Sequence, residues 1–105
     1  LDYWHLVKVH YYDCFAELSK QYNSHNFYFN TTKGCRFYTD IRYRENDMLV
    51  FGKETAGLPQ VLLEANRDYC IRIPMVDAAR SLNLSNAVAI VVYEALRQQQ
   101  FPNLC

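Results

Sequence analysis

Segment 80–86, with the sequence Arg-Ser-Leu-Asn-Leu-Ser-Asn, places an arginine and four small polar side chains just before a long apolar stretch. Such side chains can hydrogen-bond a ligand, and the stretch that follows, as far as Arg97, has the spacing of a helix. Asn83 or Ser85 can cap that helix by accepting from a backbone N–H that has no partner within it. Because capping uses only one or two of these polar residues, the others are candidates for binding a ligand.

Two more clusters of polar and glycine residues each come directly after a short apolar run. They are residues 30–34, Asn-Thr-Thr-Lys-Gly, and residues 52–57, Gly-Lys-Glu-Thr-Ala-Gly. The carboxyl ends of parallel strands lie at one edge of a sheet, where ligands bind. Together with segment 73–86, these loops therefore predict one site for a small molecule. Glu54, a carboxylate between two glycines, is its strongest candidate for a chemical role.

The remaining pattern predicts the elements that position these loops. Apolar runs predict short strands at 3–11, 27–29, 48–51 and 70–74. Helices are expected at 14–22, capped by Asp13, at 60–65, opened by Pro59, and in the stretch that ends at Arg97. This order predicts an α/β fold with a mostly parallel sheet and helices on both faces.

Two stretches leave alternatives open. The last helix has two apolar faces, one with Leu84, Val88, Val91 and Ala95 and the other with Ala89, Val92, Tyr93 and Leu96. It is either an ordinary capped core helix or one that packs on its own sheet and on a second subunit. Region 37–45 gives no firm element, and its aromatic and basic residues fit RNA stacking as well as a solvated loop; they are Tyr38, Arg42, Tyr43 and Arg44.

Composition limits the function classes. The 105 residues suit one domain, and the formal charge of zero gives no general basic excess for binding nucleic acid. No apolar run approaches the roughly 20 residues that span a bilayer, so we expect a cytoplasmic protein. The scattered cysteines suit free thiols rather than disulfides or a metal site; they are Cys14, Cys35, Cys70 and Cys105. A dinucleotide-dependent oxidoreductase is disfavoured because the phosphate-binding glycine signature is lacking.

Several motifs, in their order and spacing, closely resemble the SPOUT superfamily of RNA 2′-O-methyltransferases. They are Phe51-Gly52-x-Glu54-x-x-Gly57-Leu58-Pro59, Ile73-Pro74-Met75 and segment 80–89, followed by Tyr93-Glu94 and Arg97-Gln98. With Thr31-Thr32-Lys33-Gly34 and the opening Leu1-Asp2-Tyr3, the chain is similar from end to end to the TrmL (YibK-like) group.

The resemblance implies a trefoil knot near the C-terminus, an exception to the usual avoidance of threaded chains. It also implies a homodimer formed through the C-terminal helix and S-adenosylmethionine as cofactor. The expected activity is 2′-O-methylation of the tRNA wobble nucleotide, cytidine or a modified uridine. The implied cofactor contacts are Asn30, Gly52, Ile73, Ser81 and Leu82. Our candidates for the catalytic group, chosen for their chemistry, are Glu54, Arg80, Asn83 and Ser85. Asn30 is a departure, because family members often have an apolar residue there.

The family's amino-terminal motif, similar to E-P-x-I-P-x-N-T-G-N, is not found in residues 1–105. In the family, the helix of that motif carries an arginine often assigned to catalysis. We therefore expect residues 1–105 to be a SPOUT methyltransferase domain that lacks its amino-terminal strands. The alternative function is a catalytically inactive, knotted, dimeric RNA-binding remnant. Arg80 is expected either to bind RNA phosphate or to form a salt bridge with Glu54 or Asp77.

Overall fold

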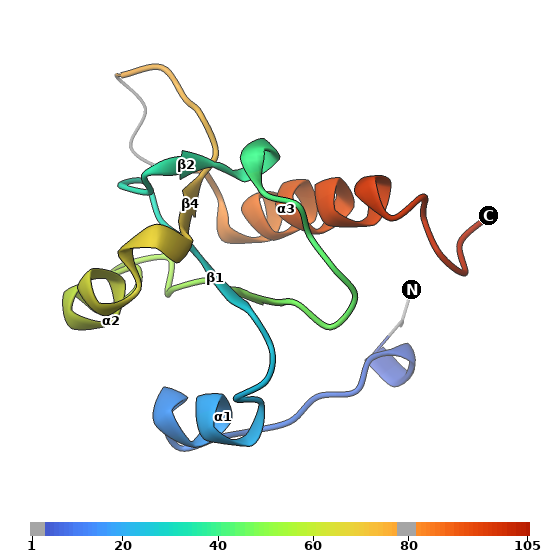
Figure 1. The fold of residues 1–105 in the computed structure, drawn as a ribbon, viewed down its shortest axis with the longest axis horizontal. Helices are drawn as coiled ribbons and strands as arrows, with labels where there is room; N and C mark the ends of the chain where they lie inside the picture. Colours follow the sequence, from blue (N-terminus) through green and yellow to red (C-terminus); the bar gives the residue numbers. More distant parts are fainter. Residues whose placement is uncertain (1–3, 78–81) are drawn as a thin grey trace.

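The computed structural model describes residues 4–77 and 82–105, which build a four-stranded parallel sheet with helices around it (Figure 1). The strands are β1 (Phe27–Asn30), β2 (Arg36–Phe37), β3 (Met48–Val50) and β4 (Cys70–Arg72), in the order β2-β4-β1-β3. The helices are α1 (Phe15–Gln21), α2 (Gln60–Ala65) and α3 (Leu84–Gln98), with single 3₁₀ turns at Trp4–Leu6, Tyr38–Asp40 and Arg67–Tyr69. Within the described ranges, no helix is long and apolar enough to cross a membrane.

Helices cover both faces of this sheet, as the sequence predicts. Side chains alternate between the two faces along a strand. On one face, Phe29 meets the ring of Phe15 in α1, with ring centroids 5.8 Å apart, and the Cys70 thiol lies 3.6 Å from the carbonyl oxygen of Leu63 in α2. On the other face, Ile71 packs with Val91 of α3. The predicted α/β fold with a parallel sheet is therefore confirmed.

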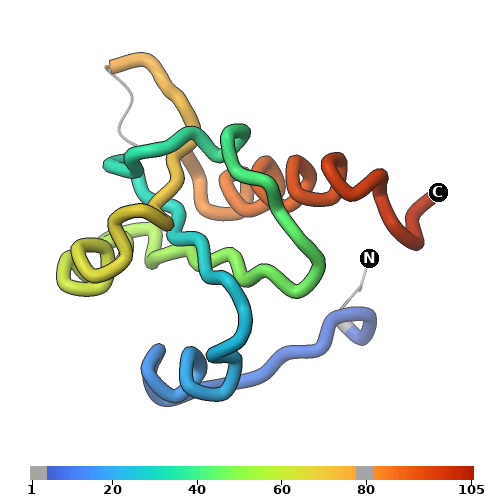
Figure 2. Tube along the Cα trace, viewed as in Figure 1, coloured from blue at the N-terminus to red at the C-terminus, as the bar shows by residue number. Residues whose placement is uncertain are grey.

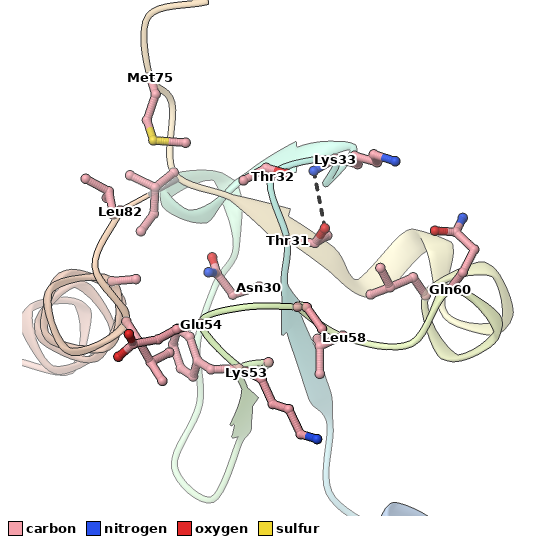
Figure 3. Close-up of a pocket in the computed structure, with 18 residues that line it drawn as sticks. Asn30, Thr31, Thr32, Lys33, Lys53, Glu54, Leu58, Gln60, Met75 and Leu82 are labelled. Carbon is pink, nitrogen blue, oxygen red and sulfur yellow. Dashed lines mark hydrogen bonds between the residues drawn. The ribbon is translucent and has the colours of Figure 1, made fainter. Parts of the chain in front are cut away.

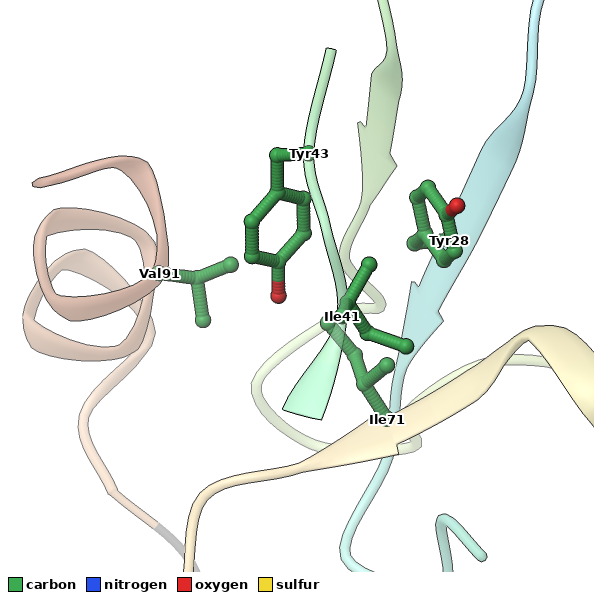
Figure 4. Close-up of a cluster of buried hydrophobic side chains, with 5 residues drawn as sticks. All are labelled: Tyr28, Ile41, Tyr43, Ile71 and Val91. Atoms are coloured by element: carbon green, nitrogen blue, oxygen red, sulfur yellow. The ribbon is translucent and has the colours of Figure 1, made fainter. Parts of the chain in front are cut away.

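The core lies between the sheet and α3 (Figure 4). Ile71 and Val91 are fully buried, and Tyr28, Ile41 and Tyr43 complete the cluster. The Tyr43 hydroxyl donates to the backbone oxygen of Tyr38 at 2.6 Å. Burial raises the pKa of Tyr43 well above its ordinary value, so this hydroxyl stays protonated. Region 37–45 is therefore not a simple solvated loop, and Tyr43 is not available to stack on RNA.

Gln98, at the end of α3, joins the helix to the connection that leads from β2 to β3, which crosses α3 in this view (Figure 2). Its Oε1 accepts from the backbone N–H of Tyr43 at 2.9 Å, and its Nε2 donates to the backbone oxygen of Ile41 at 2.8 Å. The same Nε2 donates to Glu94, whose carboxylate also pairs with Arg97 at 2.8 Å. Hydrogen bonds from Arg97 and then Gln98 lower the pKa of Glu94.

The predictions differ from the structure mainly near the amino terminus. The strand predicted at 3–11 is wrong, because Trp4–Leu6 is a 3₁₀ turn and Val7 is exposed with no strand pairing in the described chain. Helix α1 forms as predicted, but Cys14 rather than Asp13 holds the N-cap position, without a side-chain cap. Strand β2 was missed because its two residues are too few for a periodic pattern.

Replacing Gln98 with alanine tests how much its bonds stabilise the fold. Gln98→Ala leaves the Tyr43 N–H and the Ile41 carbonyl without partners, so we expect the free energy of unfolding to fall by about 2 to 4 kcal/mol. Chemical denaturation measures this loss. The matched control is Gln21→Ala, because among the described residues exposed Gln21 accepts only from the Tyr12 hydroxyl, at 3.1 Å. That control is expected to change stability by no more than about 0.5 kcal/mol. Equal losses would contradict the role of Gln98.

Candidate ligand-binding cavity at the sheet edge

A cavity of about 320 Å³ opens where β1, β3 and β4 end and α3 begins (Figure 3). This volume is within the range typical of small-molecule sites. Its walls come from the three loops that the sequence predicts to converge and from the starts of α2 and α3. The lining residues are Asn30, Thr31, Thr32, Lys33, Phe51, Gly52, Lys53, Glu54, Ala56, Gly57, Leu58, Gln60, Leu63, Ile73, Met75, Leu82, Leu84 and Ala87.

Five of the predicted site residues come together in this cavity. They are Asn30, Gly52, Glu54, Ile73 and Leu82. The convergence of the loops is therefore confirmed, although Glu54 is exposed rather than set in a buried strand end. Arg80 and Ser81 lie outside the described residues. Their predicted roles, and the predicted salt bridges of Arg80, stay predictions.

Asn83 and Ser85 do not line the cavity; Asn83 caps α3, and Ser85 is its hydrogen-bond partner in the first turn. Asn83 Oδ1 accepts from the backbone N–H of Ser85 at 2.9 Å and from the Ser85 hydroxyl at 2.6 Å. This confirms the expectation that one of the two caps the helix. The structure therefore gives both side chains a local role, and their assignment to catalysis stays a prediction.

Sequence reasoning missed the cavity residues of α2. Gln60 and Leu63 reach the cavity because α2 begins at the sheet edge, and no local motif marks them. Ala87 of α3 also reaches the cavity and lies in the motif of segment 80–89. Lys33 and Lys53, by contrast, are in the loops that the sheet-edge rule singles out.

Loop 31–34 comes after β1 and packs closely against β4. The Thr31 N–H donates to the Ile71 carbonyl at 2.9 Å, and the Thr31 hydroxyl accepts from the Lys33 N–H at 3.3 Å. Gly34 is buried so close to the backbone of Ile71 and Arg72 that a Cβ atom there would overlap both. A glycine is therefore required for this wall of the cavity to form.

Asn30 contributes the most unusual polar group in the cavity. Its Oδ1 is buried and accepts no hydrogen bond from the residues that the structure describes. A buried acceptor left unpaired costs roughly 1–3 kcal/mol. An atom of this kind at the wall of a cavity is a natural place for a donor from a ligand.

A second hollow of about 330 Å³ adjoins the cavity and shares Thr31, Lys33, Gln60 and Leu63 with it. It also includes Arg67 and Cys35. Charges of both signs line the second hollow, with Lys33 and Arg67 beside the carboxylate of Glu64 in its lining. In the part of the chain that the structure describes, no three His, Cys, Asp or Glu side chains come together as metal ligands. All four cysteines are free, as expected.

Comparison with known proteins identifies the family. The profile of the SpoU rRNA Methylase family matches residues 1–93. The chain belongs to this family. The match covers every described strand and most of α3.

Curated relatives support the same assignment. The tRNA (cytidine(34)-2′-O)-methyltransferase of Escherichia coli (strain K12) is 44% identical over 106 residues, which covers 97% of this chain and 66% of that protein. Other curated relatives reach 51% identity, with 62% of their length covered. The chain therefore spans about two thirds of the length of the relatives that it matches.

Solved structures share the fold. One, reported as giving structural insights into the 2-OH methylation of C/U34 on tRNA, has a TM-score of 0.87 and 37% identity, covering 95% of this chain and 65% of that one. The SpoU methyltransferase AviRb from Streptomyces viridochromogenes, in complex with the cofactor AdoMet, has a TM-score of 0.66 and 30% identity. That match covers 82% of this chain and 34% of AviRb.

The close approach at Gly34 can be tested by adding a single methyl group. Gly34→Ala pushes loop 31–34 away from the backbone of Ile71 and Arg72 in β4. We therefore expect a loss of about 3 kcal/mol in the free energy of unfolding. Gly57→Ala is the matched control, because nothing lies within 4 Å of a Cβ there and only its φ of 67° opposes alanine. Its expected loss is about 1 kcal/mol. Equal losses in denaturant titrations would show that loop 31–34 does not need a glycine.

Proposed function

We propose that this chain is the methyltransferase domain of an S-adenosylmethionine-dependent tRNA 2′-O-methyltransferase. The substrate would be the wobble nucleotide, cytidine or a modified uridine at the first anticodon position. The observation that carries this proposal is the cavity at the sheet edge, whose walls are the loops that contain the family's motifs. The chain that forms this cavity is 44% identical to a curated tRNA (cytidine(34)-2′-O)-methyltransferase.

The residues that line the cavity suit S-adenosylmethionine. Its inner wall is apolar, at Phe51, Ile73 and Ala87, and holds the unpaired Asn30 Oδ1, so it offers both a surface and an acceptor for a base. The contacts would come from Asn30, Gly52, Ile73 and Leu82, and from Ser81 beyond the described residues. When bound, S-adenosylmethionine supplies an activated methyl group for an oxygen nucleophile.

The residues of the chain must hold the ribose 2′-hydroxyl and remove its proton. Glu54 is exposed at the rim of the cavity, where a carboxylate can accept a proton from a hydroxyl placed there by the RNA. We assign Arg80 to substrate phosphate, and Asn83 and Ser85 to orientation through the capped start of α3. Alignment of the two reactants, rather than a covalent intermediate, supplies most of the catalysis in such a transfer.

The second hollow suits the RNA side of the site. Glu64 also lines the second hollow, where the basic side chains are Lys33, which lies in both hollows, and Arg67. These side chains can bind backbone phosphates, which position RNA without reading its sequence. Since tRNA is the proposed substrate, we place the protein in the cytoplasm.

We also propose a homodimer, formed through α3, and the trefoil knot of the SPOUT superfamily. The face of α3 that points away from the sheet carries Tyr93, which is 59% exposed and lies beside Phe101, with ring centroids 6.5 Å apart. Large exposed aromatic side chains of this kind are typical of protein interfaces.

Methyl transfer tests the activity directly. The protein is incubated with tRNA and S-adenosylmethionine carrying a labelled methyl group, and we expect label at the ribose of the wobble nucleotide. A tRNA with 2′-deoxyribose at that position should accept none, because the attacking oxygen is missing. Binding of tRNA and cofactor without transfer would instead favour the alternative, an inactive RNA-binding protein.

The role of Glu54 predicts a specific kinetic loss. Glu54→Gln keeps the size of the side chain but removes its basicity, so we expect transfer to slow by on the order of 10²-fold with cofactor affinity unchanged. Single-turnover kinetics and calorimetry separate the two quantities. Glu45→Gln, at an exposed carboxylate outside the cavity, is the matched control. Equal rates in the two variants would remove Glu54 from the mechanism.

The dimer predicts a mass change on substitution of Tyr93. Tyr93→Asp places a charge in the proposed interface, so sedimentation should shift from twice the chain mass to the chain mass. Tyr11→Asp, at a tyrosine that precedes α1 and is 89% exposed, serves as the control and should remain dimeric. A monomeric natural protein would disprove the dimer.

A further inference from the structure

Asn30 occupies a position in the sheet whose neighbours are apolar. The strand register pairs Asn30 with Ile71 of β4 and pairs Phe29 with Val50 of β3, so Phe51 follows beside Asn30. Paired residues of parallel strands point to the same face, here the face covered by α3. Ile71 is fully buried there and Phe51 packs against the core. An apolar side chain would therefore suit this row better than an amide.

The amide nevertheless points into the cavity. Figure 3 shows the Asn30 side chain at the centre of the ring of lining residues, between Thr32 and Glu54. Its Oδ1 is buried, with no hydrogen-bond partner in residues 4–77 and 82–105. Packing does not explain this polar atom, but a donor from a ligand would.

The two ends of the cavity differ in character, which restricts the part of the ligand that reaches Asn30. The inner end beside Asn30 is lined by Phe51, Ile73 and Ala87, whereas the charged side chains of Lys53 and Glu54 are exposed at the rim. A flat aromatic base fits the inner end. Charged ammonium and carboxylate groups are better solvated at the rim.

A carboxamide has the chemistry to recognise one such base. It presents an acceptor and a donor side by side, which match the 6-amino group and N7 of adenine. On the same edge a 6-oxo purine presents two acceptors, O6 and N7. Neither orientation of the amide then gives Oδ1 a donor, so Oδ1 would remain unpaired.

We propose that Asn30 recognises the adenine of a nucleoside cofactor through its side-chain amide. Oδ1 accepts from the 6-amino group and Nδ2 donates to N7. This inference rests on the proposed function, because it assigns the inner end of the same cavity to the base. It makes Asn30 a specificity-determining residue, one that selects adenine over other purines.

Calorimetry with two nucleosides tests this proposal without requiring activity. The probes are S-adenosylhomocysteine and S-inosylhomocysteine, which carries oxygen in place of the 6-amino group. The natural protein should bind the adenosyl compound roughly 5- to 150-fold more tightly, the discrimination of one bidentate amide–base pair. In Asn30→Leu, which has similar volume and no amide, that ratio should fall at least about fivefold.

The controls separate recognition from folding. Asn23→Leu makes the same change at an exposed turn residue outside the cavity and should leave both affinities unchanged. Asn30→Leu should melt no lower than the natural protein, because it removes an unpaired buried atom. If that variant does not fold, Asn30→Ala takes its place. In every case the natural protein itself must prefer the adenosyl compound.

The outcomes distinguish this inference from the proposed function. A natural protein that binds neither nucleoside overturns both. A natural protein that binds S-adenosylhomocysteine keeps the proposed function. In that case, equal affinities for the two nucleosides, or the same preference in Asn30→Leu, overturns the role of Asn30 alone.

Discussion

The packing of loop 31–34 against the backbone of Ile71 is the constraint on which the cavity depends. Ile71 is fully buried between β1 and α3, and its carbonyl accepts from the Thr31 N–H at 2.9 Å. Gly34 then passes so close to the same backbone that a side chain would not fit. Since Ile71 also belongs to the core beneath α3, this one residue connects the cavity wall to the core. Such rigid support is what a site needs in order to hold a ligand in one orientation.

A second set of contacts holds α3 in place. Gln98 bonds to the backbone of Ile41 and of Tyr43, and Tyr43 packs with Val91 in the core. The far end of α3 is therefore anchored, while its first turn, capped by Asn83, contributes Leu84 and Ala87 to the cavity. Because a helix is a rigid rod, fixing one end helps to position the other. The same helix thus joins the core, the cavity and the proposed dimer interface.

Much of this arrangement is predictable from the sequence. The apolar runs at 27–29, 48–51 and 70–74 are strong signals because each is short, and the first two are followed directly by polar or glycine residues. Once the sheet is taken as parallel, the convergence of Asn30, Gly52 and Ile73 follows from geometry alone. The predictions fail where tertiary contacts decide. The apolar segment 3–11 has strand composition but no partner strand in the described chain, and Tyr43 looks like a loop residue until Gln98 and Val91 cover it.

Asn30 shows why a departure from a pattern is informative. In the row between Phe51 and Ile71, burial favours an apolar side chain, and the amide there leaves an acceptor unpaired. Natural sequences tend to break local rules at functional sites, where stability is given up for binding. The cost falls on the unliganded protein and is recovered when a ligand supplies the missing donor. An apolar residue at this position would remove that cost, but it would also remove the side-chain means of distinguishing one base from another.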